Sequence, residues 1–229
     1  MLSRNQEKID AKIDLLKQRH PAIQFKAVAA DCSKKVSVQE YRELIEQELN
    51  DLDIGIVCLN AGCWVEGPTD MVSDADFERT FGLNGLHVMY FTKALMPKLV
   101  GRGQKSALLA TSSVLAHGKM PGIAAYTATK ALVSNFMESL HFEIAHFCDV
   151  TCWEPGPCQT NLFENGTPPP KGVTITAKNA VAAVLAQLGR ARVTNGNYWF
   201  YWMSGTLPPL WMIGSKAAKK SRDEFLRRA

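Results

Sequence analysis

Residues 106–111 read Ser-Ala-Leu-Leu-Ala-Thr and are followed at once by Ser112-Ser113. A short apolar run that stops at polar residues is typical of a buried strand. Similar runs occur at residues 54–59 (Ile-Gly-Ile-Val-Cys-Leu) and 150–153 (Val-Thr-Cys-Trp), and helical periodicity fills the stretches between them. Apolar strands that alternate with helices predict an α/β fold, in which helices cover both faces of a doubly wound parallel sheet.

The same periodicity places the other elements. Helices are expected at 5–19, 36–49, 74–99, 124–147 and 176–188, and further strands at 23–30 and 197–202. Thr176 is a plausible N-cap, and residues 161–172, with Asn-Gly and a triple proline, predict a loop. Because no linker, repeat or low-complexity tract interrupts the pattern, residues 1–229 are expected to form one domain.

Composition excludes several classes of protein. The chain has 229 residues, 46% hydrophobic and 21% charged, which is ordinary for a soluble globular protein. Its net charge of +4 is mild, and no basic stripe with interleaved aromatics suggests nucleic-acid binding. The six cysteines have neither disulfide-framework nor metal-ligand spacing, so reduced thiols and no metal are expected. No run of eighteen apolar residues occurs, which argues against a conventional transmembrane helix.

Tyr126 and Lys130 are separated by four residues in a predicted helix, so the phenol and the ammonium share a face. A neighbouring cation favours phenolate, which would lower the pKa of the phenol and make it a general acid or base. On this spacing alone, Tyr126 and Lys130 could also be a solvent-exposed pair on a helix with no catalytic role. Ser113, however, follows a strand end thirteen residues earlier, where ligands of an open parallel sheet bind. Its hydroxyl is therefore placed to polarise a carbonyl that Tyr126 protonates.

Two further sequence features are candidates for the binding site. The strand at 54–59 ends in Asn60-Ala61-Gly62, where small residues let the backbone approach a ligand. Asn84 lies within the predicted helix 74–99, where its poor helix propensity is unexpected. If it stood alone, an exposed helical asparagine would be the simpler interpretation.

Together these residues resemble the classical short-chain dehydrogenases/reductases. The matching features, in order and spacing, are Asn60-Ala-Gly62, Asn84, Ser113, Tyr126-x-x-x-Lys130 and Pro155-Gly-x-x-x-Thr160. The resemblance covers nearly the whole chain and implies a Rossmann-like sheet of strand order 3-2-1-4-5-6. A narrower similarity, to 17β-hydroxysteroid dehydrogenases and microsomal very-long-chain 3-oxoacyl-CoA reductases, lies in Asp51-Leu-Asp-Ile-Gly-Ile56, Ala128-Thr-Lys-Ala-Leu132, Leu140-His-Phe-Glu143 and Thr194-Asn-Gly-Asn-Tyr198.

The resemblance implies a catalytic set of four residues. Tyr126 would give a proton to a carbonyl or take one from an alcohol, and Ser113 would orient the carbonyl oxygen. Lys130 would hold the nicotinamide ribose and lower the pKa of Tyr126. Asn84 would bend its helix and hold a water for proton transfer.

It also implies an NADP(H) site. Asn60, with Ala61 and Gly62, and Asp31 would lie by the adenosine half, and Thr160, after Pro155-Gly156, would contact the carboxamide. Arg4 stands where the second strand ends, and its charge and fork geometry suit a 2′-phosphate, which favours NADP(H) over NAD. An N-terminal surface arginine is the alternative.

One departure is large. The family's TGxxxGxG turn should lie about 25 residues before Arg4, so the sequence is expected to lack the first strand, the glycine-rich turn and most of the second strand. Either two sheet edges stay open, or residues 23–30 pair directly with 54–59. Without the phosphate cradle, inefficient catalysis is expected. A catalytically silent homologue or a fragment with an interaction role is therefore the alternative to a lipid-directed oxidoreductase.

Substrate and partners follow from the resemblance. A steroid or a 3-oxoacyl thioester is expected, with residues 161–175 as a lid and a homodimer through the helices at 74–99 and 124–147. Residues 198–228 are rich in aromatic and basic side chains, which suits peripheral membrane contact, as on the cytosolic face of the endoplasmic reticulum, or closure of the substrate pocket in a cytoplasmic protein. Trp64 fits either a pocket edge or the core. The histidines have no partner at a sensible spacing and are expected to be packed or solvated: His87, His117, His141 and His146.

Overall fold

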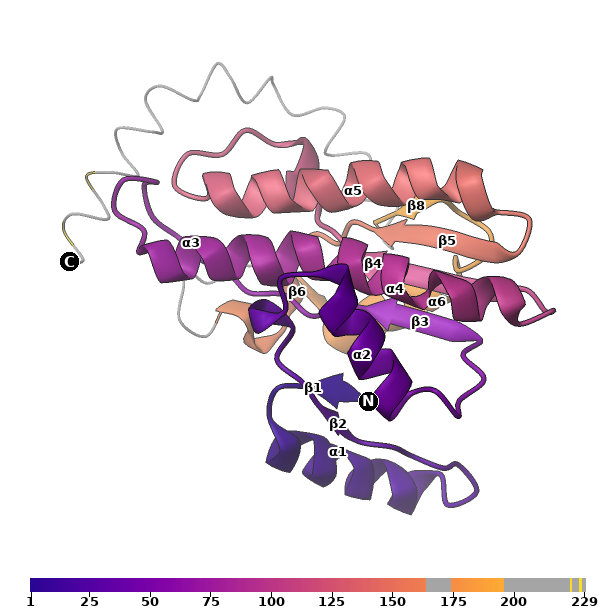
Figure 1. Cartoon of the computed structure of the whole chain (residues 1–229). Coiled ribbons are helices and arrows are strands. Elements are labelled where there is room, and N and C mark those ends of the chain that lie inside the picture. Colours follow the sequence, from indigo (N-terminus) through magenta and orange to yellow (C-terminus); the bar gives the residue numbers. More distant parts are fainter. Residues whose placement is uncertain (164–173, 196–222, 224–226, 228–229) are drawn as a thin grey trace.

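The computed structural model describes residues 1–163 and 174–195, together with Asp223 and Arg227. Its centre is a four-stranded parallel sheet with the strand order β3-β4-β5-β8. These strands are β3 (Ile56–Leu59), β4 (Ser106–Thr111), β5 (Cys148–Trp153) and β8 (Val193–Thr194). The parallel sheet predicted from the apolar runs is therefore confirmed (Figure 1).

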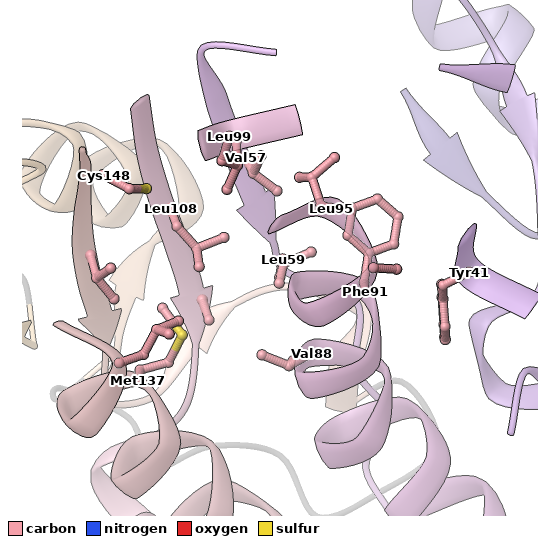
Figure 2. Close-up of a cluster of buried hydrophobic side chains, with 14 of the residues drawn as sticks. Tyr41, Val57, Leu59, Val88, Phe91, Leu95, Leu99, Leu108, Met137 and Cys148 are labelled. Atoms are coloured by element: carbon pink, nitrogen blue, oxygen red, sulfur yellow. The ribbon is translucent and has the colours of Figure 1, made fainter. Parts of the chain in front are cut away.

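Helices cover both faces of this sheet, as expected. One face carries α2 (Val38–Glu48), α4 (His87–Gly101) and α5 (Ala124–Ile144), and the other carries α6 (Ala177–Leu185). The first interface is built from apolar side chains that alternate along the strands, such as Val57, Leu59 and Leu108. Figure 2 shows these side chains packed toward Val88 and Leu95 of α4.

The helices begin where local chemistry favours a start. Ser37 and Glu40 form a capping box at the start of α2, and the Thr176 hydroxyl accepts from the Asn179 N–H at the start of α6. Asn5 caps α1 (Gln6–Arg19) in the same manner. These caps satisfy backbone N–H groups that have no partner within the helix.

The predicted long helix at 74–99 consists of three parts. α3 (Asp74–Phe81) leads through a π-helical turn, Gly82–Leu86, into α4. A Cβ on Gly85 would lie 3.1 Å from the Leu132 side chain of α5, so the glycine allows the π turn to approach α5 closely. The π turn gives this part of the chain a different side-chain direction from a regular helix.

The N-terminal strands form a separate sheet. β1 (Leu2–Ser3) pairs in parallel with β2 (Val28–Ala29), which is shorter than the strand expected at 23–30. Direct pairing of residues 23–30 with 54–59 is therefore not found. Among the described residues no strand lies beside the other edge of β3, and Ile56 on β3 is 64% exposed.

A short strand at the C-terminal end of the described residues was not predicted. The strand next to β5 is β8, which pairs Cys152 with Val193. The strand expected at 197–202 lies outside the described residues, as does the segment 198–228 apart from Asp223 and Arg227. A short parallel pair, β6 (Cys158–Gln159) and β7 (Ile175–Thr176), brackets the predicted loop, which includes a 3-10 turn at Asn161–Phe163. No helix in the described ranges is long and apolar enough to cross a bilayer.

Candidate active site

The site forms at the carboxyl edge of the central sheet. In the sheet register, Leu59 pairs with Ala110 and Thr111 pairs with Trp153, so the three strands end at the same level. The residues that follow these strands therefore lie side by side. Thr111, the last residue of β4, donates a hydrogen bond from its hydroxyl to the side-chain oxygen of Asn60 over 2.9 Å.

Ser113 and Tyr126 contact each other through their side chains. Both are buried, and the Ser113 hydroxyl lies close enough to the phenol to lower the pKa of Tyr126. Burial acts more strongly in the opposite direction and raises the pKa of Tyr126 to about 12. The expected lowering of this pKa by Lys130 is not found, since Lys130 is not among the groups that shift it. The phenol is thus protonated at neutral pH.

Lys130 lies one turn after Tyr126 on α5, as the spacing predicts. Its ammonium donates a hydrogen bond to the main-chain oxygen of Thr111 over 2.8 Å and lies 5.7 Å from the centre of the Tyr126 ring. Only 4% of the residue is exposed, and this burial lowers the pKa of Lys130 to about 8. A buried ammonium with one main-chain partner retains hydrogen-bonding capacity for a bound ligand.

Asn84 joins the π turn to the end of β3. Its side-chain oxygen accepts from the Cys63 N–H over 2.7 Å, and its amide donates to the Cys63 carbonyl over 2.9 Å. Asn84 is fully buried, so it is not the exposed helical residue of the alternative interpretation. A Cβ on Gly62 would lie 3.2 Å from the Asn84 side-chain oxygen and 3.7 Å from the Lys130 ammonium. Gly62 therefore lies close to both Asn84 and Lys130.

Trp64 belongs to the site rather than to the central core. Its ring meets the Tyr126 ring edge-on, with centroids 4.7 Å apart and planes at 60°. The side chain is half-buried, and its indole N–H donates to Glu66 over 3.4 Å. Trp64 therefore covers one side of the phenol.

Three of the remaining predicted residues follow strands of the separate short sheets, while Pro155 and Gly156 come after β5 and Glu154. Arg4 follows β1 and Asp31 follows β2, and the positive charge of Arg4 contributes to a lowered pKa of Asp31, after the larger effect of a hydrogen bond from the Ser33 side chain. Thr160 follows β6 and is exposed, with its hydroxyl accepting from the Leu162 N–H over 3.4 Å. These residues are not part of the buried group around Tyr126.

The short-chain dehydrogenase family model matches residues 1–170. The chain belongs to this family. Solved structures confirm the fold. One, from a study of 7β-hydroxysteroid dehydrogenase stereoselectivity, matches with a TM-score of 0.76 at 19% identity, and the match covers 90% of this chain and 79% of the solved chain. A short-chain dehydrogenase from Sphingobium yanoikuyae, solved in complex with NADPH, matches with a TM-score of 0.75 at 21% identity. This match covers 89% of the present chain and 81% of the Sphingobium chain.

Curated relatives match shorter stretches of this short-chain dehydrogenase. The uncharacterized oxidoreductase YbbO of Escherichia coli is 32% identical over 107 residues, which are 46% of this chain and 39% of the relative. The very-long-chain 3-oxoacyl-CoA reductase of Bos taurus is 29% identical over 147 residues, which are 62% and 45%. The chain thus spans less than half the length of these relatives.

One part of the site was missed by sequence reasoning. His117 was expected to lack a partner, but its Nε2 lies 2.9 Å from an oxygen of Glu154 in this short-chain dehydrogenase. Glu154 follows β5 directly and is 6% exposed. The available signal was a charged residue between an apolar strand and Pro155-Gly156, a position at the same sheet edge as Ser113.

Proposed function

We propose that the protein is an NADP(H)-dependent oxidoreductase that reduces a ketone or oxidises a secondary alcohol. The observation that carries the proposal is the contact between the buried Tyr126 phenol and the Ser113 hydroxyl, one helical turn from the Lys130 ammonium. A carbonyl oxygen between the two hydroxyls would receive a hydrogen bond from Ser113 and a proton from Tyr126. In the oxidative direction, the phenol would take the proton back.

The residues around Lys130 fit a dinucleotide. Among the described residues the buried ammonium has one hydrogen-bond partner, the Thr111 carbonyl, and the exposed Asn60-Ala61-Gly62 segment lies beside it at Gly62. Lys130 would hold the nicotinamide ribose, and Asn60 would lie toward the adenosine half. NADPH, when bound, supplies the hydride that the carbonyl carbon needs.

Arg4 favours NADP(H) over NAD. It lies at the end of β1, and its guanidinium would pair with the 2′-phosphate, with Asp31 nearby at the end of β2. The presence of NADPH in the Sphingobium yanoikuyae structure supports this choice. Thr160 would reach the carboxamide after the turn at Pro155-Gly156.

A lipid-like substrate, either a steroid or a 3-oxoacyl thioester, is proposed for this site. The apolar Trp64 ring beside Tyr126 suits such a substrate, and the Bos taurus relative is named for a 3-oxoacyl-CoA. We also propose a homodimer through the helices at 74–99, which include α3 and α4, and at 124–147, which include α5, where Phe142 is 70% exposed. Membrane association at the endoplasmic reticulum through residues 198–228 is part of the same proposal.

A catalytically silent role is the second candidate. It is favoured by the edge of β3, which has no strand partner among the described residues. A free strand edge can pair with another polypeptide and would then serve an interaction.

The deciding experiment measures NADPH binding and NADPH consumption by the 229-residue chain. Ketosteroids and 3-oxoacyl-CoAs form the substrate panel, and Tyr126→Phe is the control. Slow consumption that depends on a panel compound and disappears in Tyr126→Phe is expected, in line with the inefficient catalysis expected from the sequence. No consumption with any compound would favour the silent role. Equal consumption in both proteins would show that Tyr126 is not the acid.

A further inference from the structure

A chain of buried polar groups joins the ends of β4 and β5 to helix α5. The Ser112 hydroxyl donates to the main-chain oxygen of Lys130 over 2.8 Å and lies 2.7 Å from the Ser134 hydroxyl. The Ser134 hydroxyl in turn lies 2.6 Å from Oε1 of Glu154. All four residues are at most 6% exposed, so water does not compete freely for these contacts.

His117 is the outer end of this chain. Its Nε2 lies 2.9 Å from Oε2 of Glu154, and the histidine side chain is 65% exposed whereas that of Glu154 is 8% exposed. The carboxyl group stands between the serine and the imidazole. A nucleophilic triad needs the imidazole next to the hydroxyl, so this order does not make Ser134 a nucleophile.

The Glu154 carboxyl group is the acceptor at the inner end of this chain. The Lys130 carbonyl can only accept, so Ser112 donates its hydrogen to it. The Ser134 hydroxyl donates to Oε1 of Glu154, and either hydroxyl can be the donor in the contact between the two serines. The side chain at position 154 must therefore offer Ser134 an acceptor, which a carboxyl or a carboxamide oxygen can do.

The chain links the main elements of the proposed active site. Ser112 directly precedes Ser113, whose hydroxyl contacts Tyr126. The carbonyl that Ser112 holds belongs to Lys130, whose ammonium reaches back to the Thr111 carbonyl. Fixing Ser112 against Lys130 therefore fixes the Ser113 hydroxyl relative to the turn of α5 that carries Lys130.

We propose that Glu154 is a positioning residue, which acts through Ser134 and Ser112 to set the Lys130 turn against Ser113. The expected effect of Glu154 on catalysis rests on the proposed function. Its expected effect on the titration of Lys130 can be measured without turnover. His117 anchors the carboxyl group from the surface side. The position of Glu154 at the end of β5, beside Ser112 at the end of β4, makes this connection direct.

The test compares Glu154→Gln with Glu154→Met. Both substitutions keep the length of the side chain and remove the ability to ionise, so a difference between them reports the hydrogen-bond chain and not the charge. Gln can accept a hydrogen bond from Ser134 through its amide oxygen, whereas Met offers only a weak thioether acceptor. Ser134→Ala is a second interruption of the same chain, and Glu143→Met, at an exposed position on α5, is the matched control.

The first readout is the titration of Lys130, followed by NMR of lysine labelled with ¹³C at Cε and assigned from its absence in Lys130→Met. The wild-type midpoint is expected near 8. Glu154→Gln and Glu143→Met should leave it unchanged. Glu154→Met and Ser134→Ala should both move it, because the Lys130 turn loses its partner. Equal shifts in Gln and Met, or no shift in Met and Ser134→Ala, would overturn the proposal.

The second readout is kcat, measured at saturating NADPH with whichever substrate is active. Glu154→Gln should stay within about threefold of the wild type. Glu154→Met should lose about 10- to 100-fold, as misplacement of catalytic groups does. Equal losses in Gln and Met would count against the positioning role. If the wild type has no activity, the proposed function fails while the lysine titration still decides the role of Glu154.

Discussion

The side chain of Asn84 makes two hydrogen bonds with the main chain of Cys63, one in each direction, across 21 residues of sequence. This pairing ties the π turn between α3 and α4 to the loop that follows β3. It also accounts for an asparagine within a helical stretch, since an amide both donates and accepts where the main chain offers one donor and one acceptor. The loop it holds carries Gly62 and Trp64, which border Lys130 and Tyr126.

Asn84→Leu should therefore destabilise the protein by about 3 kcal/mol. The substitution leaves the N–H and carbonyl of the half-buried Cys63 without their partner, and an unpaired group that is cut off from water costs about 1–3 kcal/mol. Urea unfolding measures the change. Asn179→Ala, at an exposed position of α6, is the control and should change stability by less than about 0.5 kcal/mol. Equal effects of the two substitutions would contradict the importance of the Asn84 pairing.

Tyr126→Phe should lower kcat by about 10²- to 10⁴-fold and leave the Kd for NADPH nearly unchanged. The phenol provides the proton, whereas the ring, which Phe keeps, provides the contact with Trp64. Steady-state kinetics and a fluorescence titration of NADPH measure the two quantities. Retention of more than a tenth of the rate would rule out Tyr126 as the acid.

Lys130→Met should change how stability depends on pH. The pKa of Lys130 is lowered from 10.5 to about 8 in the folded protein. Between these values the unfolded chain binds the proton and the folded protein does not, so this lysine makes stability rise with pH. From pH 7 to pH 9.5 the wild type should gain about 2 kcal/mol relative to Lys130→Met.

Urea unfolding of both proteins at the two pH values measures this gain. Other groups with shifted pKa, such as Tyr126, are common to both proteins and cancel in the comparison. A constant difference between wild type and variant across this range would show that Lys130 is not desolvated in the folded state.

Arg4→Ala should weaken NADPH binding much more than NADH binding. The guanidinium can pair with the 2′-phosphate, which NADH does not have. Arg19→Ala, at an exposed position at the end of α1, should affect neither cofactor. The measurement is the Kd of NADPH and of NADH for each variant. An equal loss of affinity for both cofactors in Arg4→Ala would show that Arg4 does not bind the 2′-phosphate.

The sequence by itself determined the central sheet and much of the site. The apolar runs at 54–59, 106–111 and 150–153 and the four-residue spacing of Tyr126 and Lys130 are local patterns, and local patterns predict strands, helices and shared helix faces. They also locate Ser113 at a strand end, because the ends of neighbouring parallel strands meet at one edge of the sheet. These features hold whatever the distant parts of the chain do.

Only the tertiary structure decided the features that depend on burial and on contacts between distant segments. Tyr126 has a raised pKa because the fold removes it from water, and no sequence pattern gives the extent of that burial. Glu154 meets Ser134 and His117 from three separate elements, and β2 pairs with β1 and not with β3. Such pairings follow from how the elements pack together, whereas spacing in the sequence constrains only residues within one element.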